Sequence, residues 1–88
     1  MFGTVEVKEV KVAVGSLIKT ARKQRKLTQQ EVAERIQVSR NTIQNLEAGK
    51  NFTADTLLRV LKDFDLLEPL FHRVKDQQKN IEQTKPLY

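Results

Sequence analysis

Polar and apolar positions along residues 28–48 follow the pattern of short amphipathic helices. Thr28 and Glu31 have the spacing of a capping box, in which each side chain bonds a free backbone amide of the other's turn. Leu27, immediately before this start, is placed to pack on Val32 as a hydrophobic staple. The same combination recurs at two later starts: Ser39 with Val38 and Ile43, and Thr53 with Phe52 and Leu57. The pattern therefore predicts three helices with defined first residues.

The connection between the first two of these helices is very short. Gln37, Val38 and Ser39 alone separate the last apolar residue of one helix from the start of the next. So brief a turn forces the two helices to cross steeply, as they do in a helix-turn-helix unit.

The second helix of this pair has a polar side suited to DNA. Ile43 and Leu46, three residues apart, define its buried face. The residues on its far side and flank are all polar: Arg40, Asn41, Gln44 and Asn45. In the major groove arginine makes paired contacts to guanine, and asparagine or glutamine makes them to adenine. The alternative is an ordinary solvated face, because periodicity shows amphipathicity and not groove contact.

Apolar spacing predicts one helix before these three and one after them, which gives an all-α body of five helices over residues 15–75. The first ends near Arg25 and has an inner face of Leu17, Ile18 and Ala21. The fourth carries Leu57, Leu58, Leu61 and Phe64 at helical spacing. A fifth begins near Pro69, a residue tolerated in a first turn. The apolar stripe there either closes the core or forms a twofold dimer contact, and comprises Leu66, Leu67, Leu70, Phe71 and Val74.

The two ends of the chain differ from this body. In residues 1–14 valines alternate with charged residues, with a change of phase midway. We interpret this segment either as a short β-strand arm that pairs with a second copy or another protein, because a lone strand is unstable, or as a flexible terminus. Residues 76–88 are polar and cannot bury enough apolar surface to order themselves. They are expected to form a tail, with Leu87 and Tyr88 as its docking residues.

The central segment resembles the Cro/repressor-type helix-turn-helix proteins, the xenobiotic-response-element group of bacterial and phage regulators. The resemblance covers about residues 17–67 and is strongest in Leu-Thr-Gln-Gln-Glu-Val-Ala and in Val-Ser-Arg-Asn-Thr-Ile-Gln-Asn-Leu-Glu-Ala-Gly-Lys. It implies a compact, lambda-repressor-like DNA-binding domain in which Ala33 is the small residue where two helices touch. The turn residue that is often glycine in this family is Gln37 here, and a left-handed conformation there costs about 1 kcal/mol. Gly49 is expected to end the recognition helix in that same conformation.

The resemblance also implies roles for individual residues. The base-facing positions are Ser39, Arg40, Asn41, Gln44 and Asn45. Phosphate contacts are expected from Thr28, Gln29, Gln30, Thr42 and Lys50. Arg22 and Glu47 occupy the positions of an ion pair that joins the first helix to the end of the third. A basic cluster before the unit adds a flank suited to phosphates, and it consists of Lys19, Arg22, Lys23, Arg25 and Lys26.

Composition narrows the class of protein. Sixteen basic and eleven acidic residues among 88 give a net charge of +5, which favours a polyanionic partner. Cysteine is absent, which excludes disulfides and thiol chemistry. His72 is the only histidine and has no accompanying carboxylate constellation, so we expect no enzyme, no metal site and no cofactor. With no long apolar run and no signal-peptide pattern, we expect no membrane contact and a cytoplasmic location.

Three functions fit these features. The leading hypothesis is a transcriptional repressor that binds a palindromic operator in double-stranded DNA as a homodimer. The second is an antitoxin of the HipB type, which represses its own operon and binds a kinase-like toxin; residues 49–61 resemble that subgroup. The third is a protein-interaction module that never touches bases. The polar face with Arg40 and Asn41 argues against it, because a protein-binding face more often exposes aromatic or apolar anchors.

Overall fold

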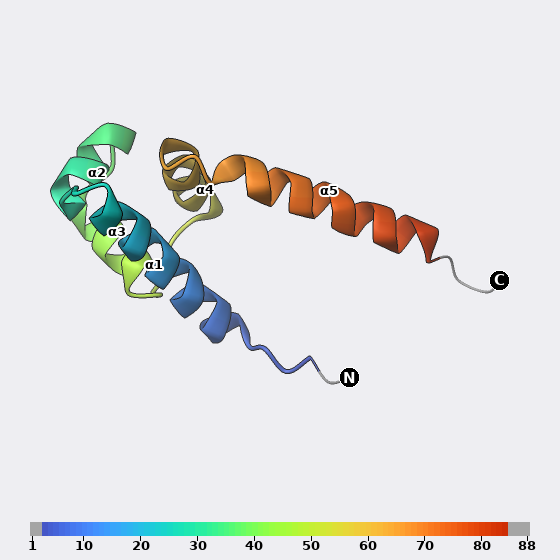
Figure 1. The fold of residues 1–88 in the computed structure, drawn as a ribbon. Coiled ribbons are helices and arrows are strands. Elements are labelled where there is room, and N and C mark those ends of the chain that lie inside the picture. The colour runs from blue at the N-terminus through green and yellow to red at the C-terminus, as the bar shows by residue number, and fades with distance from the viewer. Residues whose placement is uncertain (1–2, 85–88) are drawn as a thin grey trace.

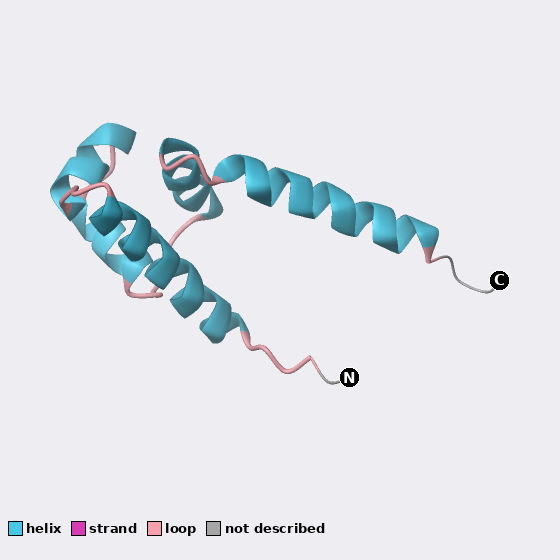
Figure 2. Cartoon of the chain, in the orientation of Figure 1, coloured by secondary structure: helices cyan, strands magenta, loops and turns pink. Residues whose placement is uncertain are grey.

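Helices account for all of the regular structure in the part of the chain that the structure describes. The computed structural model describes residues 3–84, and within that range it contains five helices and no strand (Figures 1 and 2). In chain order they are α1 (Val7–Gln24), α2 (Gln29–Ile36), α3 (Arg40–Glu47), α4 (Ala54–Asp63) and α5 (Leu67–Gln83). The predicted all-α, five-helix class is confirmed. No helix in residues 3–84 is both long enough and apolar enough to cross a membrane.

The helices α1 to α4 gather around one core, and α5 extends away from it (Figure 1). The overall dimensions, 53 × 24 × 21 Å, reflect this projection. The buried apolar side chains come from each of the first four helices and from Phe64, which directly follows α4. They are Ile18, Ala21, Val32, Ala33, Ile36, Ile43, Leu46, Val60, Leu61 and Phe64. Because α5 buries none of its residues, the core does not depend on most of that helix.

Three helices begin at the residues that the sequence predicts. Thr28 precedes α2 with a complete capping box: its hydroxyl accepts a hydrogen bond from the Glu31 amide at 3.0 Å, and the Glu31 carboxylate accepts one from the Thr28 amide at 2.7 Å. Ser39 and Thr53 cap α3 and α4, and each accepts a bond from the amide three residues on at 3.1 Å. Each such cap stabilises its helix by about 1 kcal/mol.

The first four helices end in the same kind of left-handed turn. In each, one residue has a positive φ, and the next amide bonds to a carbonyl five residues earlier, as in a Schellman motif. The left-handed conformations predicted at Gln37 (φ 61°) and Gly49 (φ 72°) are confirmed. Lys26 and Asp65, both with φ 59°, make the equivalent turns after α1 and α4, and the sequence did not reveal them.

The prediction that residues 1–14 form a strand or a flexible terminus is wrong for residues 7–14, which are helical. Residues 7–14 form the first two turns of α1 and are neither a strand nor a flexible terminus. The apolar positions of this segment continue one face of the helix: Val7, Val10, Val14, Ile18 and Ala21. The apparent alternation arose because a second set of valines lies between them. A helix satisfies its own backbone groups, so it needs no partner strand.

The predicted polar tail is also wrong as far as residue 83. α5 continues to Gln83, and each of its residues from 76 onward is exposed to solvent. The prediction assumed that order requires apolar burial. Extending a helix that has already formed gains one hydrogen bond for each residue fixed, and the segment consists mainly of good helix formers. Leu87 and Tyr88, the predicted docking residues, lie outside the described residues.

Candidate nucleic-acid interface

Helix α3 is fixed to the body by a buried face and by a very close crossing. Ile43 and Leu46 are completely buried. α1 crosses the end of α3 at Gly15, where a Cβ atom would lie 2.5 Å from the Glu47 carbonyl oxygen and 2.6 Å from that of Leu46. Only glycine allows this approach, so α3 is held by backbone contact with α1 as well as by its own apolar side chains.

The polar face predicted for base recognition is turned outward. Arg40, Asn41 and Gln44 are exposed, and Asn45 is half-buried on the same helix. A short helix whose one face is fixed to a core and whose other face presents such side chains has the form that enters the major groove. The base contacts themselves remain predictions.

Ser39 and Thr42 form the first turn of α3. The Ser39 hydroxyl accepts a hydrogen bond from the Thr42 amide at 3.1 Å, and the two hydroxyl oxygens lie 2.9 Å apart. Most of the bonding capacity of the Ser39 side chain is therefore used to hold the helix start. The predicted base contact of Ser39 and the predicted phosphate contact of Thr42 would use the hydrogen-bonding positions of the two hydroxyl groups that these internal bonds leave free.

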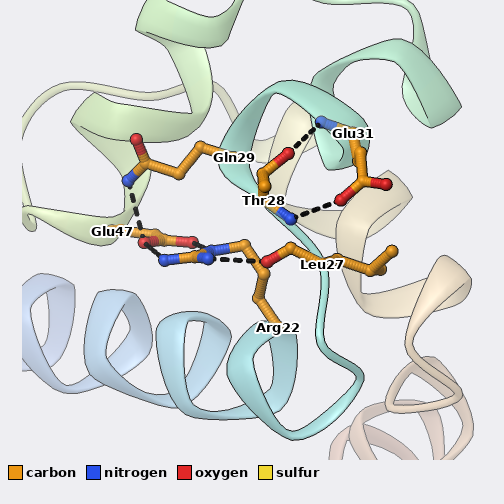
Figure 3. A network of polar contacts seen from close by, with 6 residues as sticks. All are labelled: Arg22, Leu27, Thr28, Gln29, Glu31 and Glu47. Carbon is orange, nitrogen blue, oxygen red and sulfur yellow. Dashed lines mark hydrogen bonds and ion pairs between the residues drawn. The ribbon is translucent and has the colours of Figure 1, made fainter.

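The other residues predicted at phosphates lie at the first turn of α2 and just after α3. Thr28, Gln30 and Lys50 are exposed. The side-chain amide nitrogen of Gln29, Nε2, instead donates to Glu47 Oε1 at 3.0 Å (Figure 3). Because an amide nitrogen carries two hydrogens, one is still available to a phosphate. The phosphate role of Gln29 stays a prediction, and the structure adds an internal role that the sequence did not reveal.

Arg22 and Glu47 form the ion pair that the resemblance implies (Figure 3). Arg22 Nε donates to Glu47 Oε2 at 2.6 Å and Nη2 donates to Oε1 at 3.1 Å, while Nη1 donates to the Leu27 carbonyl at 2.8 Å. The side chains are only 11% and 4% exposed. With Gln29, this network joins α1, the start of α2 and the end of α3. The hydrogen bond from Arg22 to Glu47 raises the pKa of Arg22 above its ordinary value, so the guanidinium stays charged.

Part of the predicted basic flank is used inside the protein. Besides Arg22, Arg25 donates to the Phe64 carbonyl at 2.7 Å and its guanidinium lies 5.0 Å from the Phe64 ring centroid. Lys19, Lys23 and Lys26 are exposed and remain candidates for phosphates.

Two contacts that join α2 to α4 could not be read from the sequence. Arg35 donates to both carboxylate oxygens of Asp63, at 2.7 and 3.0 Å, and this bond raises the pKa of Arg35. Arg59 donates to the carbonyl of Ile36 at the end of α2. Both contacts join residues far apart in the chain, where no local spacing indicates a pair.

The predicted dimer contact divides into two groups. Leu66 and Leu67 pack in part against the core. The outer residues Leu70, Phe71 and Val74 are 37%, 58% and 56% exposed. The sequence missed two further exposed residues, Leu58 on α4 and Ile81 near the end of α5. We define the α5 stripe as Leu70, Phe71, Val74 and Ile81; a hollow of about 700 Å³ between α4 and α5 adjoins its first three members.

The region that contains this interface is similar to known proteins. Residues 18–70, more than half of the chain, match the helix-turn-helix family. One relative, the Multiprotein-bridging factor 1 of Candida albicans, is 37% identical over 79 residues, which cover 81% of this chain and 52% of the relative. The chain thus spans about half the length of that relative.

Proposed function

The chain belongs to the Cro/C1-type helix-turn-helix family of DNA-binding proteins, and on that premise we propose that it is a sequence-specific transcriptional repressor. In this proposal it acts in the cytoplasm and binds a palindromic operator as a homodimer, with one α3 in each of two major grooves about 34 Å apart. Repression by blocking a promoter needs neither a cofactor nor a ligand.

The observation that carries the proposal is the fixed position of α3. Its inner face is buried, its end is held by the Arg22–Glu47 network, and its outer face presents Arg40, Asn41 and Gln44. A rigid helix loses little conformational freedom when it enters the groove, so more of the contact energy appears as affinity.

Replacing Arg40 or Asn41 with alanine is expected to weaken binding to the preferred operator by about 1–3 kcal/mol and to relax the choice of base at one position in each half-site. The operator would be found by selecting bound DNA from a random pool with the wild-type protein. Binding titrations with the operator and with single-base variants would then measure the loss for each protein variant.

Arg73→Ala is the matched control, because it removes the same charge from α5, outside the proposed DNA-binding face. It should leave the choice of base unchanged. If Arg40→Ala weakened all sequences equally, the base-reading role would be wrong. A wild-type protein that selects no sequence from the pool would contradict the proposed function.

The α5 stripe supports the homodimer. Its members Val74 and Ile81 are exposed and follow the core-contacting Leu67 at intervals of seven residues, as in a helix that packs along another helix. A twofold axis would cover the stripe with the same stripe of a second copy. It would also double the number of phosphate contacts.

Phe71→Glu is expected to convert the dimer to a monomer at micromolar concentration, because a charge would have to be buried at the centre of the contact. Sedimentation measures the mass directly. Gln83→Glu, which adds the same charge to the opposite side of α5, should remain dimeric. A wild-type protein that is monomeric both free and on DNA would contradict the dimer.

A second candidate function is protein binding in addition to DNA binding. The relative is named as a bridging factor, and the α5 stripe has the exposure that a protein contact requires. The kinase-like toxin expected for a HipB-type antitoxin would be one such partner. A monomeric wild-type protein whose α5 stripe binds such a partner would favour this candidate over the simple repressor.

A further inference from the structure

Two lysines of α1 and one from the loop after α3 share one shallow hollow beside the end of α3. The hollow has a volume of about 420 Å³ and is lined by Val7, Lys8, Lys11, Gly49, Lys50 and Asn51. Lys8 and Lys11 belong to the first turns of α1, which precede the segment matched by the family. Family membership therefore assigns no role to them.

Close packing determines where these lysines lie. At Gly49 a Cβ atom would lie 2.9 Å from the Val12 Cα, so the loop after α3 presses against the backbone of α1. The Lys50 amide bonds to the Asn45 carbonyl at 2.9 Å and completes the turn. The Lys11 ammonium lies 5.9 Å from the centroid of the Phe52 ring, a cation–π contact. The backbone of the loop and the side chain of Lys11 are thus held in place.

The described residues that line the hollow include no acidic side chain. Every ion pair in residues 3–84 involves an arginine, and none involves Lys8, Lys11 or Lys50. Grouped like charges repel one another, and a bound anion relieves that repulsion. Lysine ammonium groups bind phosphate as point charges and do not require one orientation. An open hollow that includes Lys50, a residue expected at a phosphate, is suited to a phosphate that remains part of a strand.

We propose that this hollow binds backbone phosphates of the DNA that α3 reads, so that the DNA-binding surface extends beyond the helix-turn-helix unit onto the first turns of α1. The inference rests on the proposed function. Lys8 and Lys11 are about 4.5 Å apart along the helix axis, and each DNA strand carries one phosphate per roughly 3.4 Å of its axis. Because the two lysines are three residues apart and line the same hollow, both can contact the same stretch of DNA backbone. Such contacts raise affinity for every sequence and do not select bases.

The test compares salt dependence for a random-sequence duplex, so it needs no known operator. For wild type and for the double variant Lys8→Gln/Lys11→Gln, the dissociation constant would be measured over a series of salt concentrations. A plot of log affinity against log salt has a negative slope, and its magnitude should decrease by about 2 in the double variant, since each phosphate contact contributes about 0.9. Lys75→Gln/Lys79→Gln, an equal charge change on α5, should keep the wild-type slope. Lys8→Arg/Lys11→Arg should keep it as well.

Two further measurements keep the result interpretable if the Lys11 substitution disturbs packing on Phe52. Lys8→Gln alone removes an exposed ammonium group and should decrease the magnitude of the slope by about 1. On the operator selected from the random pool, phosphate ethylation should interfere with wild-type binding at one or two phosphates where it does not affect the double variant. An unchanged slope in both variants, with a wild type that binds DNA, would overturn this inference and leave the proposed function intact. A wild type that binds no duplex would instead refute the proposed function.

Discussion

Glu47→Ala is expected to lower the free energy of unfolding by about 3–5 kcal/mol, because it leaves the guanidinium of Arg22 buried without its carboxylate. The Arg22 side chain is 11% exposed, so water cannot replace the lost partner fully. The amide of Gln29 loses its acceptor at the same time. For a domain of this size, whose total stability is about 5–15 kcal/mol, the melting temperature should fall by roughly 12–40 °C.

Urea denaturation and thermal melting measure this loss. Glu34→Ala is the matched control on α2, since Glu34 is exposed and bonds only the side chain of Gln30 at 3.1 Å; it should change stability by about 0.5 kcal/mol at most. The double variant Arg22→Met/Glu47→Leu should recover most of the loss, because it removes the unpaired charge as well. A melting temperature of Glu47→Ala equal to that of wild type would show that the pair does not stabilise the fold.

DNA binding should weaken together with stability. Glu47 is the last residue of α3, and its carboxylate holds that end against α1 and α2. Glu47→Ala should therefore reduce affinity for the operator and for other DNA alike, whereas Arg40→Ala should weaken binding to the operator more than binding to other DNA.

Gly15→Val is expected to destabilise the protein by about 3 kcal/mol or more, the upper range for overpacking. A Cβ atom at this position would lie within 2.8 Å of three backbone atoms of Leu46 and Glu47, and backbone cannot rotate away as a side chain does. α1 and α3 would have to separate, and the recognition helix would shift with respect to α2.

Ser16→Val is the control for Gly15→Val. It places the same branched side chain on the same helix one residue later, where the chain is exposed. Its effect should stay within about 1 kcal/mol, since serine and valine have similar helix propensities. Equal stabilities of the two variants in urea would mean that α1 can move away from α3 at little cost.

Local signals in the sequence predicted the central part of the fold well. The caps at Thr28, Ser39 and Thr53 and the turn at Gly49 depend on residues within one turn of each other, so their spacing specifies their geometry. The same is true of the outward face of α3, which follows from the position of Ile43 and Leu46 alone.

Prediction from the sequence failed where the structure depends on contacts between distant residues, or where the apolar residues fit both the two-residue period of a strand and the period of a helix. The valines before residue 15 fit a strand and a helix equally well, and the helix is favoured because Val14 packs against the core and Val12 lies against Gly49 in the loop after α3. The basic hollow brings Lys8 to Lys50 only after α1 crosses α3. The two arginines Arg35 and Arg59 likewise find their partners only in the folded protein. The Arg22–Glu47 pair spans 25 residues, and only the resemblance to a family indicated it.

The left-handed turns after α1, α2 and α4 leave room for engineering. Lys26, Gln37 and Asp65 adopt a conformation that costs a residue with a side chain about 1 kcal/mol each, whereas glycine adopts it freely. Natural proteins generally stop accumulating stability once folding is sufficient. Glycine at these three positions should therefore make the domain more resistant to heat, without altering any residue of the outward face of α3.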